Sequence, residues 1–159
     1  NVAAQGDGSV LDTDDSAGRR RSIYQIVRRS QHLTMLDLFD TPLMEVNCVE
    51  RPASIVPLQA LAMLHGPQAD RAALAVSERT LAAANTDPER IVWVYRLLFS
   101  RTPRPTEQQH LTIFLDEVRK QQLTGKPTPT PDEQLQANKY AWKEASLVLL
   151  NTNEFLFVQ

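Results

Sequence analysis

Apolar residues recur along most of the chain at intervals of three and four, and prolines or polar turn residues interrupt the pattern. Such spacing places apolar side chains on one face of a helix. It predicts helices over residues 57–64, 67–85, 88–100, 106–124 and 131–151. About half of the chain lies in these windows, against about one third in an average globular protein. The sequence therefore predicts an all-α fold, a compact bundle of about five helices with irregular, proline-bracketed connections.

The predicted helices carry capping signals at their ends, where side chains replace missing backbone hydrogen bonds. A threonine with a glutamate or glutamine three residues later has the spacing of a capping box. A glycine just after a helix suits the left-handed terminating position. Four such signals are present: Asp87 before Pro88, Thr106 with Gln109, Thr130 with Glu133, and Gly125 as a terminator.

The apolar faces indicate which side of each helix is buried. Residues 91–99 are apolar on nearly every side except at Arg96, which is typical of a central helix, so we expect them in the core. Residues 155–158 form an apolar tail that we expect to dock on the helical body. The other predicted faces are Ala69, Ala72, Ala73 and Val76, whose small size favours a close helix contact; Leu111, Phe114, Leu115 and Val118; and Ala141, Trp142, Ala145, Val148 and Leu149.

The first part of the chain has a different character. Residues 1–18 contain glycines and four aspartates but no basic residue, and we expect a flexible acidic lead-in there. Residues 19–159 are then expected to form a single helical domain. Ile23, Ile26 and Val27 fit either one face of a helix or a short strand near residue 24, and the pattern leaves both possibilities open.

The composition of the chain excludes several classes of function. The 159 residues carry a net charge of −2, which argues against a nucleic-acid binder that depends on bulk positive charge. No apolar run approaches the about 20 residues that a membrane-spanning helix needs. A single cysteine excludes an internal disulfide, a four-cysteine zinc site and a CxxCH haem attachment within this sequence.

A cluster of arginines is the most prominent local charge feature. The five arginines lie within eleven positions that contain no acidic residue. The cluster could bind an anion, an acidic partner or nucleic acid, with Tyr24 available for stacking. The balance of charge favours the simpler interpretation, a basic surface segment paired with the acidic lead-in, and makes nucleic-acid binding the weaker hypothesis. The cluster consists of Arg19, Arg20, Arg21, Arg28 and Arg29.

The remaining reactive residues form no catalytic or metal-binding motif. Cys48 could act as a nucleophile only beside a base, and His32, His65 and His110 are scattered along the sequence without ligand spacing. We therefore predict no catalytic, cofactor-binding or metal-binding residue.

Two further expectations concern packing. Arg51 lies in a proline-bracketed stretch, and we expect it to pair with Asp37 or Asp40. The aromatic residues have helical spacing that favours core packing over a ligand groove; they are Trp93, Tyr95, Phe99, Phe114 and Trp142.

Five segments in this order resemble a known family. They are RRSIYQIVRR at 20–29, MLDLFDTP at 35–42, CVERPASIVPLQALAML at 48–64, YRLLFSRTPRPTEQ at 95–108 and LLNTNEFLFV at 149–158. Together they are similar to the planctomycete-specific PSD-one domain of unknown function, the C-terminal domain of planctomycete cytochrome-c-like proteins. One departure is His65–Gly66, where the family usually has asparagine followed by aspartate or serine.

The resemblance implies that the chain is the C-terminal part of a larger domain in an extracytoplasmic protein, either periplasmic or at the cell surface. It implies a c-type haem domain upstream in the parent protein and no cofactor in this chain. It supplies no activity and no catalytic residues. We expect a non-catalytic interaction or scaffold domain whose partners are upstream domains of the parent or another protein chain. The alternatives are a component of a cell-surface enzyme or glycan-binding protein in polymer breakdown, and anion or nucleic-acid binding through the arginine cluster.

Overall fold

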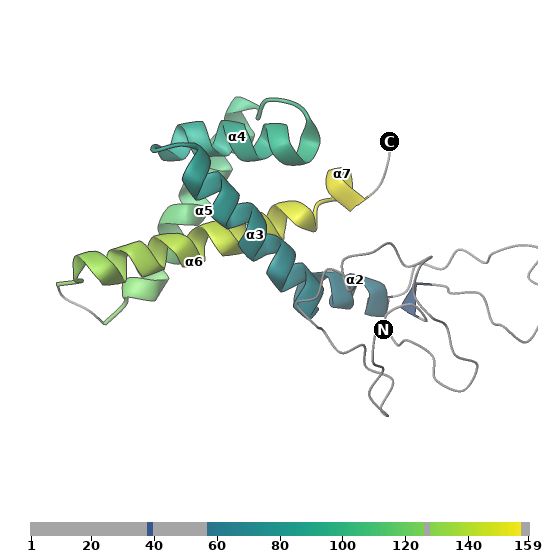
Figure 1. Ribbon diagram of the computed structural model, residues 1–159, viewed down its shortest axis with the longest axis horizontal. Coiled ribbons are helices and arrows are strands. Elements are labelled where there is room, and N and C mark those ends of the chain that lie inside the picture. Colours follow the sequence, from purple (N-terminus) through teal and green to yellow (C-terminus); the bar gives the residue numbers. More distant parts are fainter. Residues whose placement is uncertain (1–37, 40–56, 126–127, 157–159) are drawn as a thin grey trace, which may run out of the picture. The chain divides into compact units, whose positions relative to one another are not determined.

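The computed structural model describes residues 38–39, 57–125 and 128–156 (Figure 1). The chain divides between Ala60 and Leu61 into two units, and most described residues belong to the second. The helices are α2 (Pro57–His65), α3 (Pro67–Ala83), α4 (Asp87–Phe99), α5 (Pro105–Leu123), α6 (Pro131–Leu150) and α7 (Asn153–Leu156). All five predicted helices are present within two residues of their expected ends, and no strand occurs among the described residues, so the all-α prediction is confirmed.

Proline fixes where the long helices begin. Each helix from α3 to α6 has proline in its first two positions, where the missing N–H would have no helical partner. The predicted capping box of α6 is confirmed: the Glu133 N–H donates to Thr130 Oγ1 at 3.4 Å, and the Thr130 N–H donates to Glu133 Oε2 at 2.9 Å. Gly125, with φ of 84°, follows α5 in the left-handed conformation, as predicted.

Two predicted caps are wrong by one or two positions. Thr86 rather than Asp87 caps α4, and its Oγ1 hydrogen-bonds Glu89 Oε2 at 2.7 Å. Helix α5 begins at Pro105, so Thr106 lies inside its first turn, and the Arg104 N–H donates to the Glu107 carboxylate at 2.7 Å. In both cases the helix begins one residue earlier than predicted, and a glutamate side chain accepts a hydrogen bond from the N-cap backbone N–H.

The core forms where α4, α5 and α6 meet, as the pattern over residues 91–99 predicts. Trp142 is its largest fully buried side chain. Among the predicted face residues of α5 and α6, Val148 is the exception, because 48% of it is exposed. The buried cluster consists of Ile91, Val94 and Tyr95 from α4, Leu111 and Leu115 from α5, and Ala141, Trp142, Ala145 and Leu149 from α6.

Helix α3 crosses α6 (Figure 1), and the two make extensive contact through small side chains. Ala73 belongs to the predicted small face and is fully buried, but Ala72 is exposed, and Ser77 and Thr80 complete the buried stripe. The hydroxyls of Ser77 and Thr80 donate to backbone carbonyls of α3, each at 2.8 Å. The crossing therefore buries polar side chains whose hydrogen bonds are already made within the helix.

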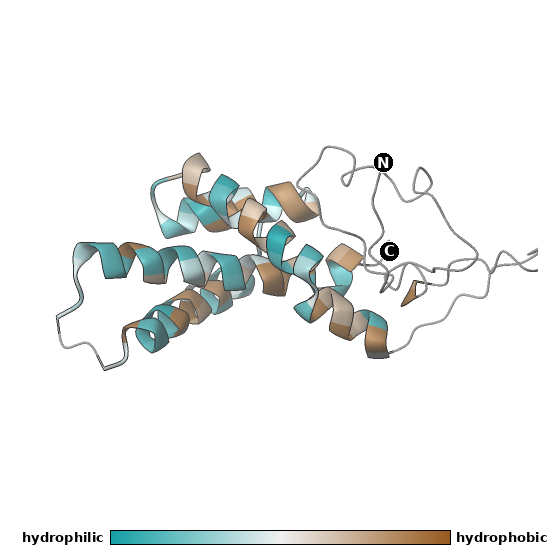
Figure 2. Cartoon of the chain, turned by 60° about the horizontal axis from the view of Figure 1, so that its bottom comes forward, coloured by the Kyte–Doolittle hydropathy of each residue, from teal (hydrophilic) through white to brown (hydrophobic). Residues whose placement is uncertain are grey.

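Two observations on the surface complete the fold. Figure 2 shows hydrophilic and hydrophobic residues interspersed around the long helices, and no helix of the described part is both long and apolar enough to span a membrane. Helix α7 lies against α4 and α6, but Phe155 and Leu156 remain more than one third exposed. Phe157 and Val158 lie outside the described residues, as do the predicted lead-in and the segment near residue 24.

Candidate functional site

Most of the predicted site residues lie outside the described part of the chain. These are Arg19, Arg20, Arg21, Arg28, Arg29, His32, Asp37, Asp40, Cys48 and Arg51. His65 on α2 and His110 on α5 are both exposed. Within the described ranges, no three histidine, cysteine, aspartate or glutamate residues gather as a metal site would require. The arginine cluster and the Arg51 pairing therefore stay predictions.

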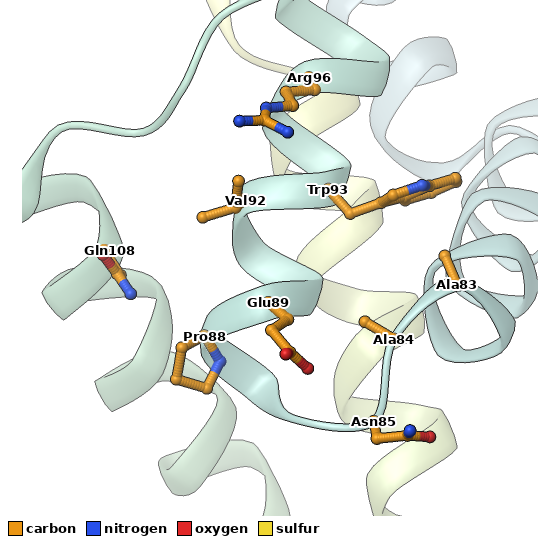
Figure 3. A pocket seen from close by; sticks show the side chains of 9 residues that line it. All are labelled: Ala83, Ala84, Asn85, Pro88, Glu89, Val92, Trp93, Arg96 and Gln108. Carbon is orange, nitrogen blue, oxygen red and sulfur yellow. The ribbon is translucent and has the colours of Figure 1, made fainter.

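A first surface depression, which we call the Trp93 hollow, lies over α4 between the end of α3 and the start of α5 (Figure 3). Its volume is about 620 Å³. The Trp93 ring extends toward Ala83 and also packs against the core. Trp93 therefore has the packing role that the sequence predicted, but it also lines this hollow. The hollow is lined by Ala83, Ala84, Asn85, Pro88, Glu89, Val92, Trp93, Arg96 and Gln108.

The charged groups of the Trp93 hollow are placed for contact rather than for proton transfer. The Glu89 carboxylate accepts hydrogen bonds from the Thr86 hydroxyl and N–H, which lower its pKa and keep it ionised. The guanidinium of Arg79 lies 5.9 Å from the centre of the Trp93 ring, within cation–π range. Glu89 of the lining and Arg79 nearby thus both have structural roles.

A second set of charges joins α5 and α7 to the end of α4. Arg101 forms bidentate pairs with Glu107 at 2.7 and 2.8 Å and with Glu154 at 2.6 and 2.7 Å. Its guanidinium also lies over the rings of Tyr95 and Phe99, at 5.4 and 5.7 Å. The Arg101 hydrogen bonds lower the pKa of Glu107 to about 2 and also lower that of Glu154. Helix α7 is therefore held by an ion-pair node where the sequence predicted apolar docking.

A third set of charges centres on Asp87 at the start of α4. Its carboxylate pairs with Arg119 of α5 at 2.7 Å and accepts from Nε1 of Trp142 at 3.4 Å. Burial raises the Asp87 pKa, but Arg119, Trp142 and Arg90 together outweigh it, so the net pKa is lowered. Arg119 also donates to Asn138 Oδ1 at 2.6 Å. The Asp87 set therefore fastens α4, α5 and α6 together.

A second depression, the leucine hollow, lies where the end of α2 and the start of α3 approach α6. Its volume is about 550 Å³. Its lining is mainly apolar, from Leu64, Pro67, Leu147 and Val148, with the acids Asp70 and Glu144 and with His65. Leu64 is 42% exposed.

Further apolar surface lies close to the leucine hollow along the helices. Leu61, one turn before Leu64, and Leu74, one turn after Asp70, are also exposed. The spacing of these leucines by three or four positions was the only sequence signal for an exposed apolar surface here. The sequence analysis did not predict the hollow, because the helical pattern assigned Val148 to the core.

One comparison with known protein families found a match for this chain. A family model described as PSD1, protein of unknown function (DUF1553), matches residues 3–115. The chain belongs to this family. Comparisons of this PSD1 chain with curated proteins and with solved structures found no match. The resemblance stated from the five sequence segments is thus confirmed at the level of the family.

The PSD1 match covers the two hollows to different extents. Every residue lining the Trp93 hollow lies within it, and so do Leu64, Pro67 and Asp70 of the leucine hollow. Glu144 and Val148 come from α6, which follows the matched residues. The PSD1 description assigns no activity, so a function for this chain has to be argued from its surfaces.

Proposed function

We propose that this PSD1 chain is a non-catalytic helical interaction domain within an extracytoplasmic, cytochrome-c-like multidomain protein. Its partner is an upstream domain of the same parent protein. The observation that carries the proposal is the leucine hollow, where Leu64 and Val148 expose 42% and 48% of their surface beside a concave lining. Exposed apolar surface gathered at a depression is typical of protein-binding sites.

The electrostatic arrangement supports binding in preference to catalysis. A catalytic acid needs a pKa near the working pH, which burial or a neighbouring like charge usually provides. The opposite holds for Glu107 and Asp87, whose arginine partners lower their pKa values. Both carboxylates are therefore ionised at neutral pH and act as hydrogen-bond acceptors that join helices.

The extracytoplasmic location and the haem-bearing upstream domain come from the family resemblance. They predict that the gene encodes, ahead of this chain, a secretory signal and a CxxCH haem attachment. Sequencing the complete gene tests this part directly. An upstream sequence with neither feature would contradict the redox setting.

The interaction itself is tested with the upstream segment produced separately. Titration calorimetry should show that the chain binds this segment, and Val148→Ser should weaken binding by about tenfold, because one buried apolar anchor contributes about 1–2 kcal/mol. Ile113→Ser is a matched control, since Ile113 is 49% exposed on α5 and does not line the leucine hollow. A wild-type chain that binds no upstream segment, or equal weakening by both substitutions, would refute the proposal.

A further inference from the structure

We propose that the leucine hollow receives an amphipathic helix of basic character, with leucine-like side chains on one face and lysine or arginine beside them. This inference rests on the proposed interaction role and specifies the chemistry of the partner. It depends on the shape of the hollow, its apolar lining and the imbalance of its charges.

The apolar lining fits the side chains of one helical face. Leu64 and Pro67 come from α2 and α3, and Leu147 and Val148 come from the facing part of α6, so the apolar surface has two walls. The volume of about 550 Å³ is within the range of sites that bury a ligand. Helices that dock in such grooves insert side chains at i, i+3 or i+4, and i+7.

The rim of the leucine hollow carries a net negative charge. Asp70 pairs with Lys143, and this pairing raises the pKa of the Lys143 ammonium. Glu144, the other acid in the lining, has no ion-pair partner in the part of the chain that the structure describes. A cation on the incoming helix would form an ion pair with Glu144, whereas an acid there would be repelled by it.

The same charges argue against a second copy of the chain as the occupant. Two copies related by two-fold symmetry would bring the same patch of each copy together. Each copy would then bring its net negative rim against the net negative rim of the other. A basic partner helix avoids this repulsion and supplies what the rim lacks.

The test uses two labelled fourteen-residue peptides with identical leucine positions, one with lysine and one with glutamate at the remaining positions. Fluorescence anisotropy measures their binding to the full chain. We expect the leucine–lysine peptide to bind at least tenfold more tightly than its glutamate twin. Val148→Ser should weaken its binding about tenfold, and Glu144→Gln about three- to tenfold with a shallower dependence on salt. Ile113→Ser and Glu117→Gln, both exposed on α5, should leave binding unchanged.

Several results would overturn the inference. They are equal binding of the two peptides, equal weakening by Val148→Ser and Ile113→Ser, or a dimer that Val148→Ser converts to a monomer. Circular dichroism verifies the fold of each variant, and Val148→Thr replaces Val148→Ser if the latter unfolds. If the upstream segment binds but Glu144→Gln leaves its affinity and salt dependence unchanged, the inference fails while the proposed function stands. If only the leucine–lysine peptide binds, with the expected sensitivities, the proposed function fails instead.

Discussion

Arg101 offers the sharpest test of how the second unit is held together. Its guanidinium connects Glu107 in the first turn of α5 with Glu154 of α7, and it stacks on two aromatic rings of α4. Arg101→Met keeps much of the apolar stem and removes all of the charge. The variant therefore isolates the electrostatic contribution of the node.

The magnitude follows from the Glu107 carboxylate. Lowering its pKa from 4.5 to about 2 corresponds to at most about 3 kcal/mol of stabilisation at neutral pH. Part of this comes from the Arg104 N–H, which Arg101→Met leaves in place. Since 25% of the Glu107 side chain is exposed, water and salt screen the pair further. We expect Arg101→Met to lower the free energy of unfolding by about 1–2 kcal/mol, or the melting temperature by about 5–10 °C.

The pH dependence has a definite sign. A carboxylate whose pKa is lower in the folded state stabilises the fold above its unfolded pKa, near 4.5, and loses that contribution as the pH falls toward about 2. The difference in stability between wild type and Arg101→Met should therefore be full at pH 7 and shrink progressively between pH 4.5 and pH 2. Urea unfolding followed by far-ultraviolet circular dichroism measures this difference at each pH.

Arg96→Met is the control, because Arg96 lies on α4 five residues before Arg101, is exposed and has no ion-pair partner among the described residues. It should change stability by less than about 0.5 kcal/mol. The reasoning would be refuted if Arg101→Met were as mild as Arg96→Met at pH 7. It would also be refuted if the effect of Arg101→Met were the same at pH 2.5 as at pH 7.

Three further substitutions test other parts of the structure. Gly66→Ala should destabilise the chain by about 1–3 kcal/mol in urea unfolding, because its Cβ would overlap the carbonyl oxygen of Ala62; unchanged stability would show that this contact relaxes freely. Trp142→Phe should cost about 1–3 kcal/mol, since it leaves a cavity in the core and removes the Nε1 bond to Asp87, and a thermal melt indistinguishable from wild type would contradict this. Asp87→Asn should cost about 1–2 kcal/mol at pH 7 and progressively less below about pH 4, because the folded-state pKa of Asp87 is lowered; a cost independent of pH would show that charge is not its cause.

The positions and types of the long helices were predictable from local information. Proline at the helix starts, the Thr130–Glu133 box and Gly125 act within a few residues, so their effect can be read from neighbouring positions. The errors at the starts of α4 and α5 arose because two nearby residues could each have capped the helix, Asp87 or Thr86 in α4 and Thr106 or Arg104 in α5. Val148 was assigned to the wrong environment because its helical face borders the core without entering it.

The candidate site could be predicted only in part, because its residues come from separate helices. Periodicity shows that Leu61 and Leu64 share a face, but it does not show that no described helix covers that face. Likewise, nothing in the sequence indicates that Arg101 meets Glu154, which lies 53 positions later. Such pairings depend on how helices cross, and crossing depends on the packing of side chains that are distant in sequence.

The all-α class, the helix boundaries to within two residues and the family could thus be read from the sequence, since helix formation and capping are local and the family segments are linear. The arginine-bound state of Glu107 and Asp87, and the shared hollow of Leu64, Glu144 and Val148, became visible only in the packed helices. Charge pairing and surface exposure depend on which residues are neighbours in space, and sequence order does not specify those neighbours. The helices α2, α3 and α6 acquire those neighbours only when they pack.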